Sequence, residues 1–168
     1  MKAIITNFLS SPIFMPTVLL LASLFALAGA YTAEYGFDLQ PCSLCSYERI
    51  PYFIVAVLAV VAIFFATKKA RIAKILCVIC AVLMLFEFGL SGYHIGVEKG
   101  VFEESCTVNF TAEDIESLKE ELFATPVISC KDVQFELFGI SMAGWNALYA
   151  LGLAGFVFMG ISYKPKKS

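Results

Sequence analysis

Cys42 and Cys45 are separated by two residues, a spacing that can close a small disulfide ring. Reduction of such a pair frees a thiolate, which is a nucleophile and, when its pKa is low, a good leaving group. An apolar run begins at Ile50. A helix there places Cys45 at or just before the helix N-terminus, where unpaired N–H groups favour negative charge. Arg49 lies one helical turn beyond Cys45, and Pro51 fits a first helical turn. The stretch therefore predicts a reactive dithiol at a membrane surface.

The composition is that of a membrane protein with room for one domain. Of 168 residues, 60% are hydrophobic and 15% are charged, and the mean hydropathy is +0.82. A soluble domain is nearer half apolar and a quarter charged. No basic patch carries interleaved aromatic residues, so nothing favours nucleic-acid binding. We expect a single transmembrane domain over residues 1–168.

Apolar runs along the chain predict four membrane spans. The expected spans are 13–33, 50–67, 75–92 and 139–163. Backbone polar groups inside lipid must be satisfied within helices, so we predict an all-α, integral membrane four-helix bundle. Ala28-Gly29-Ala30 resembles a signal-peptide cleavage site, but the run is longer than a signal core and we expect it to be retained.

Basic residues sort to one side of this four-span arrangement, and no Asp or Glu falls with them. They are Lys2, Lys68, Lys69, Arg71, Lys74, Lys164, Lys166 and Lys167. Excess Lys and Arg near span ends marks the cytoplasmic side, so both termini are expected in the cytoplasm. The connections 34–49 and 93–138, which carry cysteines, are then expected to face outward.

The long connection 93–138 contains a pattern typical of a short amphipathic helix. Thr111 fits a capping position, and Pro126 lies near the expected end. Apolar residues recur at helical spacing against acidic ones. The apolar set is Ile115, Leu118, Leu122 and Phe123, and the acidic set is Glu113, Glu116, Glu120 and Glu121. Cys106 and Cys130 bracket this predicted helix.

Four cysteines, Cys42, Cys45, Cys106 and Cys130, lie in the outward connections and allow three pairings. For Cys106 and Cys130, a structural bridge and a redox role are about equally supported. A bridge between Cys42 and Cys45 would gain little loop entropy, which favours a redox role. Zinc binding would require all four cysteines to remain free thiols, which an oxidising compartment disfavours, so we expect no metal.

The third span contains three side chains that could carry chemistry. Cys77 and Cys80 lie on one helical face inside lipid, and we expect them to be small buried hydrophobes. Glu87 is the one acidic residue within a span, and it should face the bundle. A helix-to-helix hydrogen bond is favoured for Glu87 over a proton path.

The motif Pro-Cys-x-Leu-Cys-x-Tyr-Glu-Arg, from Pro41 to Arg49, resembles that of the DsbB family of quinone-linked disulfide-forming membrane proteins. The resemblance covers the whole chain and includes the segments 92–98, after the third span, and 138–146, entering the fourth. The sequence around Gly92 is similar to that of alphaproteobacterial members.

This resemblance implies a relay of cysteines. Cys106 would be attacked by a reduced thiol of a soluble, thioredoxin-like partner of the DsbA type, and the released Cys130 would attack Cys42. Cys45 would remain as a thiolate beside a quinone, either ubiquinone or menaquinone, to which it passes electrons. Arg49 would stabilise that thiolate and the charge developing on the quinone.

The resemblance also implies a role for His94, the one histidine. The family places a histidine near the quinone, where it can donate a proton to the reduced form. Pairing of His94 with Glu98, four residues on, is equally supported. Glu48 is expected to pair locally with Arg49 or with a backbone N–H.

The predicted function is that of a bacterial inner-membrane enzyme that reoxidises a periplasmic dithiol protein and reduces quinone. One alternative is a vitamin K epoxide reductase-like quinone reductase, although there the reactive pair usually ends a late span. The other is a non-catalytic membrane protein with structural disulfides; a transporter would be expected to show internal repeats or broken helices.

Overall fold

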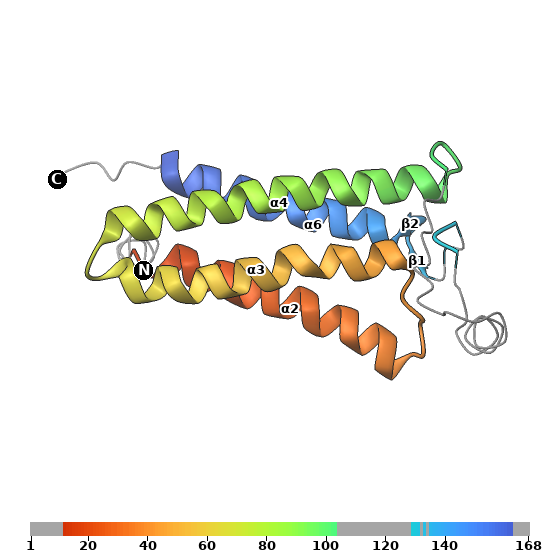
Figure 1. The fold of residues 1–168 in the computed structure, drawn as a ribbon, viewed down its shortest axis with the longest axis horizontal. Helices are drawn as coiled ribbons and strands as arrows, with labels where there is room; N and C mark the ends of the chain where they lie inside the picture. Colours follow the sequence, from red (N-terminus) through yellow and green to blue (C-terminus); the bar gives the residue numbers. More distant parts are fainter. Residues whose placement is uncertain (1–11, 104–128, 132, 134, 163–168) are drawn as a thin grey trace, which may run out of the picture.

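Four long helices dominate the computed structural model, which describes residues 12–103, 129–131, 133 and 135–162 (Figure 1). The helices are α2 (Phe14–Gly36), α3 (Ser43–Ala66), α4 (Ala70–Glu98) and α6 (Met142–Ser162). Each of them is long and apolar enough to cross a membrane, which confirms the expected all-α membrane four-helix bundle. The predicted amphipathic helix and Cys106 lie outside the described residues.

α2, α3 and α4 each extend beyond the predicted span at the end that carries the cysteines, whereas α6 lies within its predicted span. α3 begins at Ser43 rather than near Ile50, and Cys42 is its N-cap, with an extended backbone at φ −71° and ψ 170°. Pro51 therefore lies inside α3, so its interpretation as a first-turn proline is wrong. A proline at that position removes one helical hydrogen bond, which neighbouring helices can compensate in a membrane bundle.

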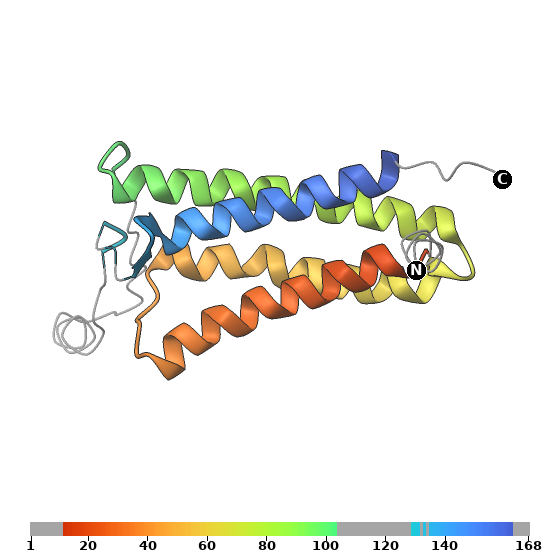
Figure 2. The same ribbon diagram turned by 180° about the vertical axis from the view of Figure 1, so that it is seen from behind.

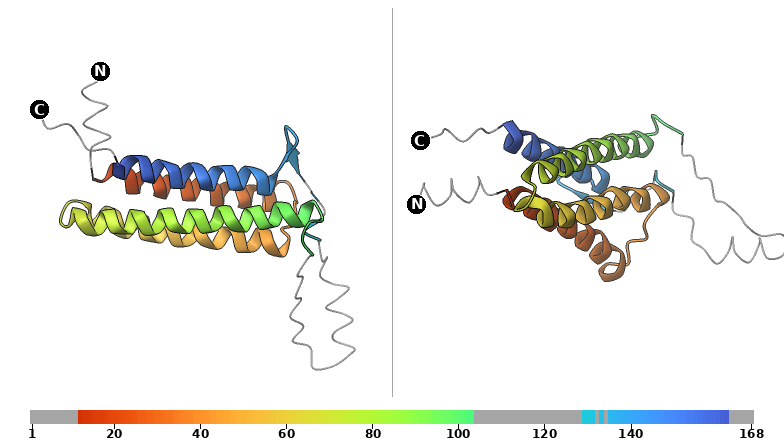
Figure 3. Two further views of the ribbon diagram at one scale, coloured as in Figure 1. Left: turned by 90° about the horizontal axis from the view of Figure 1, so that it is seen from above. Right: turned by 60° about the vertical axis from the view of Figure 1, so that its left-hand side comes forward.

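The helices pack as a row that is open on one side. α2 packs on α3, α3 on α4, and α4 on α6, whereas α2 and α6 contact each other little. Phe14 and Phe156 meet with ring centroids 6.2 Å apart, and the Tyr149 hydroxyl donates to the Ala22 carbonyl at 2.9 Å. Beyond these contacts α2 diverges from α6 toward the end that carries the cysteines (Figures 2 and 3).

Small side chains fill much of the core between the helices. α3 buries Ala59, Ala62 and Ala66, and α4 buries Cys77 and Cys80 in the same cluster. Small residues let helix backbones approach closely where lipid supplies no hydrophobic drive. The expectation that Cys77 and Cys80 are small buried hydrophobes is confirmed by this burial.

A β-hairpin precedes α6 and was not predicted. Its strands β1 (Glu136–Leu137) and β2 (Ile140–Ser141) are antiparallel, and the turn residues Phe138 and Gly139 have φ of 57° and 76°. Positive φ at both turn positions is the type I′ geometry that matches strand twist. The Ser141 hydroxyl accepts from the Gly144 N–H at 3.2 Å and donates to Glu98 at 2.6 Å. The hairpin thereby joins the start of α6 to the end of α4.

Candidate thiol redox site

The Cys42–Cys45 pair is built into the first turn of α3. The Cys42 sulfur accepts the Cys45 N–H at 3.3 Å, as an N-cap side chain does, and the two sulfurs are 2.9 Å apart. The Cys42 thiol donates to the Cys45 sulfur, and both cysteines are free thiols. This hydrogen bond, with burial, raises the pKa of Cys42 to about 12. The proton of the reduced pair therefore stays on Cys42, which leaves Cys45 as the sulfur that carries negative charge.

Cys130 lies beside this pair although it is far away in the sequence. Its side chain is buried in one cluster with Cys42 and Val97, and it interacts with the Cys42 thiol. The Cys130 sulfur is 3.6 Å from the Ser43 hydroxyl. Burial raises the pKa of the Cys130 thiol, and the hydrogen bond to Ser43 opposes that shift. Three of the four cysteines predicted to carry chemistry are thus brought together.

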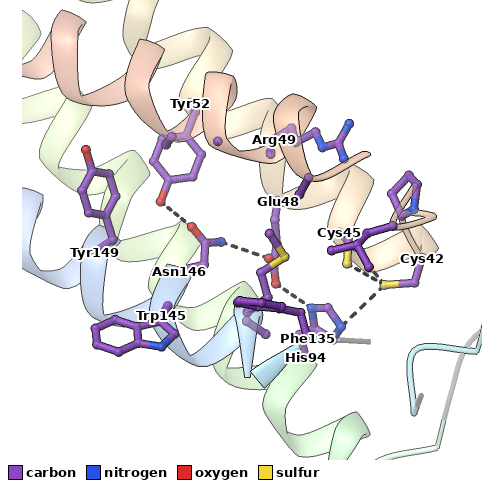
Figure 4. A pocket seen from close by; sticks show the side chains of 18 of the residues that line it. Cys42, Cys45, Glu48, Arg49, Tyr52, His94, Phe135, Trp145, Asn146 and Tyr149 are labelled. Carbon is purple, nitrogen blue, oxygen red and sulfur yellow. Dashed lines mark hydrogen bonds and ion pairs between the residues drawn. The ribbon is translucent and has the colours of Figure 1, made fainter. Parts of the chain in front are cut away.

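His94 connects the dithiol to a buried acid. Its Nε2 is 3.6 Å from the Cys42 sulfur, and its Nδ1 is 2.9 Å from Glu48 Oε1 (Figure 4). Glu98, the alternative partner, is further from Nε2, at 4.0 Å. The imidazole is therefore held between a thiol and a carboxylate, an arrangement that can move a proton between them.

Glu48 is the site residue that sequence reasoning missed. It was expected to pair with Arg49 or a backbone N–H, but it is buried and binds His94 and the Asn146 amide, the latter at 3.0 Å. The buried stripe of α3 contains Glu48, Tyr52 and Val55, which follow helical spacing. That stripe was the available signal, because it continues from the apolar span back to Glu48.

Arg49 points to a different partner from the one predicted. Its guanidinium forms an ion pair with Glu34 on α2 and lies 4.8 Å from the centroid of the Tyr31 ring. Arg49 lines the same cavity as Cys45, but no described hydrogen bond or ion pair joins the two side chains. Its stabilisation of a thiolate at Cys45 stays a prediction.

A cavity of about 560 Å³ lies against the dithiol. Cys45, Arg49 and His94 line it, and apolar residues of α2 and α6, the helices that diverge here, form much of its wall. Small-molecule sites commonly have this size and this combination of apolar walls and a few polar groups. A flat, largely apolar ring with two carbonyl oxygens, such as a quinone, fits these walls and donors.

Asn146 on α6 joins polar groups from three helices. Its side-chain oxygen accepts from the Tyr52 hydroxyl at 2.6 Å. Its nitrogen lies 3.0 Å from Glu48, 2.7 Å from Glu87 and 3.0 Å from Ser91. Glu87 thus faces the bundle and makes a helix-to-helix hydrogen bond, as expected.

Cys42, Cys45 and His94 are also close enough to share a metal ion, since their ligand atoms lie within 4.8 Å of one another. A structural zinc site usually takes four ligands. The expectation of no metal stays a prediction.

A buried dithiol with a third thiol beside it, at one end of a four-helix membrane bundle, defines the class as membrane thiol-redox proteins. The family model for disulfide bond formation protein DsbB matches residues 13–160. The chain therefore belongs to the DsbB family, and its homologues support a role as a membrane disulfide bond formation protein of the multi-pass type.

Relatives of similar length match nearly the whole chain. An uncharacterised protein of Rickettsia prowazekii (strain Madrid E) is 31% identical over 157 residues, which are 90% of this chain and 88% of the relative. Disulfide bond formation protein B of Xanthomonas oryzae pv. oryzae (strain MAFF 311018) is 24% identical, covering 84% of this chain and 85% of its own. The protein of the same name from Nitrosococcus oceani is 24% identical, with coverages of 89% and 86%.

Proposed function

We propose that this protein oxidises a soluble, thioredoxin-like dithiol protein of the DsbA type on the periplasmic side of the bacterial inner membrane and passes the electrons to a membrane quinone. The observation that carries the proposal is the contact of Cys130 with Cys42, in a dithiol that borders an apolar cavity. The positive residues at the opposite end of the bundle, such as Lys68 and Lys74, support this orientation.

In the proposed relay, a partner thiolate attacks Cys106 and releases Cys130. Cys130 then attacks Cys42, which breaks the Cys42–Cys45 bond and frees the Cys45 thiolate at the cavity wall. Attack at Cys42 is favoured because the leaving sulfur, Cys45, lies in the first turn of α3, where unpaired backbone N–H groups favour a thiolate. The second thiol of the partner then displaces Cys106, and Cys106 attacks Cys130 and restores their disulfide. This step releases Cys42 as a thiol, whose proton His94 and Glu48 exchange.

A quinone, when bound, supplies a two-electron acceptor in the cavity. Cys45 and Arg49, which line the cavity, would hold its head group, and His94 would hold the proton that accompanies the electrons. Apolar residues of α2 and α6 exclude water from this space. The proposed acceptor is ubiquinone or menaquinone.

The test measures quinone absorbance in the purified protein loaded with ubiquinone, with and without a reduced thioredoxin-like dithiol protein. We expect dithiol-dependent loss of oxidised quinone in the wild type, and a trapped mixed disulfide at Cys106 in the Cys130→Ser variant. The matched control is Cys77→Ser, because Cys77 is a buried cysteine of the apolar core and does not belong to the cluster that contains Cys42 and Cys130. It should retain quinone reduction.

Failure of every dithiol donor to reduce the quinone would contradict the proposal and leave a membrane protein with structural disulfides. Electron flow only from quinol to the cysteines would instead favour the vitamin K epoxide reductase-like alternative.

A further inference from the structure

Glu87 is a buried acid that takes no part in the proposed relay. Its side chain is 0% exposed, and it lies on α4 two turns before His94. Glu87 Oε1 binds the Asn146 amide and accepts from the Ser91 hydroxyl at 3.3 Å. Glu87 Oε2 has no hydrogen-bond partner among the described residues. A carboxylate oxygen left in this state inside a membrane bundle is costly, so the group needs a further reason to be there.

The Asn146 amide brings Glu87 and Glu48 together. An amide nitrogen carries two hydrogens, and three acceptors surround this one. The Ser91 hydroxyl can itself donate to Glu87, so the two amide hydrogens go to the two carboxyl groups. Since both bind the same nitrogen, at 3.0 and 2.7 Å, their oxygens lie within roughly 6 Å of each other.

The charges around this pair do not compensate two ionised acids. His94 from α4 faces Glu48 and, at 4.0 Å, Glu98, and it can balance one negative charge. Tyr52 from α3 binds the same amide as a neutral hydroxyl. Arg49 from α3 is paired with Glu34 from α2, and α6 contributes only neutral groups, Asn146 among them. Glu87 forms no ion pair within the described part of the chain. Two carboxyl groups this close, with one cation beside Glu48, can hold one proton in common.

We propose that Glu87 is the second member of a proton-holding carboxyl pair with Glu48, joined by the Asn146 amide. The pair receives the Cys42 proton through His94 and delivers a proton into the cavity. Its role in turnover rests on the proposed function, whereas the shared proton does not.

The protons and electrons balance without another reactant. Oxidation of one partner dithiol releases two electrons and two protons, and conversion of a quinone to a quinol takes up two of each. Because Cys45 is a thiolate in the reduced pair, Cys42 carries one of these protons and the carboxyl pair stores the other. The carboxyl pair ends each cycle with the one proton with which it began. Glu87 holds this stored proton, so Glu48 keeps the charge that binds His94 until the Cys42 proton arrives.

The first test requires no quinone. Infrared spectra of the purified protein at neutral pH should contain a protonated-carboxyl band that disappears in Glu87→Gln and changes in frequency in Glu48→Gln, where no second carboxyl group shares the proton. Ser23→Ala is the matched control, because Ser23 is equally buried on α2 and outside this network. It should retain the band at its wild-type frequency. A band that survives Glu87→Gln, or that is unchanged in Glu48→Gln, would overturn the proposal.

The second test measures turnover. Glu87→Gln should slow quinone reduction by about tenfold or more, as loss of a proton-transfer group does, and flatten its dependence on pH. Trapping of the partner at Cys106 in a Cys130→Ser background should be unchanged. Wild-type turnover and pH dependence in Glu87→Gln would overturn the role. Absence of quinone reduction in the wild type itself would contradict the proposed function, while the infrared result would still decide the shared proton.

Discussion

At the scale of single residues, the site assigns different work to two neighbouring thiols. Cys42 is the N-cap, and its sulfur both accepts the Cys45 N–H and donates to the Cys45 sulfur. The same contact that keeps the proton on Cys42 stabilises charge on Cys45. Position in the first helical turn therefore decides which sulfur of the reduced pair keeps the proton and which carries the charge.

This separation predicts selective alkylation of the reduced protein. Because the pKa of Cys42 is raised to about 12, roughly one Cys42 in ten thousand is a thiolate at pH 8. Iodoacetamide at that pH should modify Cys45 at least tenfold faster than Cys42, as measured by peptide mass spectrometry. Cys42 labelling should increase as pH rises, and unfolded protein, in which both thiols are exposed, is the control. Equal labelling in the folded protein would contradict this assignment.

The same pKa makes the reduced fold sensitive to alkali. The folded state retains the Cys42 proton above the ordinary thiol pKa of 9.0, where the unfolded state loses it. The contribution of Cys42 to the free energy of unfolding is complete below pH 9 and is lost as the pH rises toward 12.

At the scale of elements, the side-chain amide of Asn146 forms hydrogen bonds that join α6 to both α3 and α4. Asn146 accepts from Tyr52 on α3 and donates to acids on both helices. Helices in lipid gain little from apolar contact, so such a bond fixes how each helix is rotated about its axis. The hairpin before α6 adds a second point, since the Ser141 hydroxyl donates to Glu98 of α4 at 2.6 Å.

Asn146→Leu should therefore destabilise the bundle more than its volume change suggests. It leaves Glu48 and Glu87 without their shared donor, at a cost of roughly 2–4 kcal/mol. Tyr52→Phe removes only one bond to Asn146 and should cost about 1–2 kcal/mol. Unfolding of both variants in one detergent would measure the difference. Equal stabilities would contradict the bridging role of the amide.

At the scale of the whole molecule, the row of helices leaves one side open beside the dithiol. α2 and α6 meet near one end of the bundle and diverge toward the cysteines, and the cavity lies between them. Gly29 of α2 lines this cavity, and a Cβ added there would meet no atom within 4 Å.

Gly29→Phe should fill the cavity while the fold is retained. We expect quinone reduction to fall by about tenfold or more because the ring occupies the binding space, with Cys106 trapping unchanged. Gly152→Phe is the matched control, because Gly152 is equally unobstructed on α6 and does not line the cavity. Normal quinone reduction in Gly29→Phe would show that the electron acceptor binds elsewhere.

Much of the fold was predictable from the sequence, whereas the rotation of the helices was not. Apolar runs revealed four spans, and the spacing of Cys42 and Cys45 revealed the dithiol. The link from Glu48 to Asn146 depends on which faces of α3 and α6 meet, and apolar runs carry little information about that in lipid. The hairpin was missed because its turn is Phe138-Gly139, which lacks the usual Asn or Asp before Gly.

The divergence of α2 and α6 also determines whether a ligand enters the cavity from water or from lipid. Its wall belongs to helices that cross the membrane, so an isoprenoid-tailed molecule would exchange sideways through the acyl chains and its tail would stay in lipid. Occupancy would then follow the mole fraction of that molecule in the bilayer rather than its concentration in water. If the amounts of protein and of this molecule are fixed and the amount of lipid is increased, occupancy of the cavity should fall, because the molecule is diluted within the bilayer.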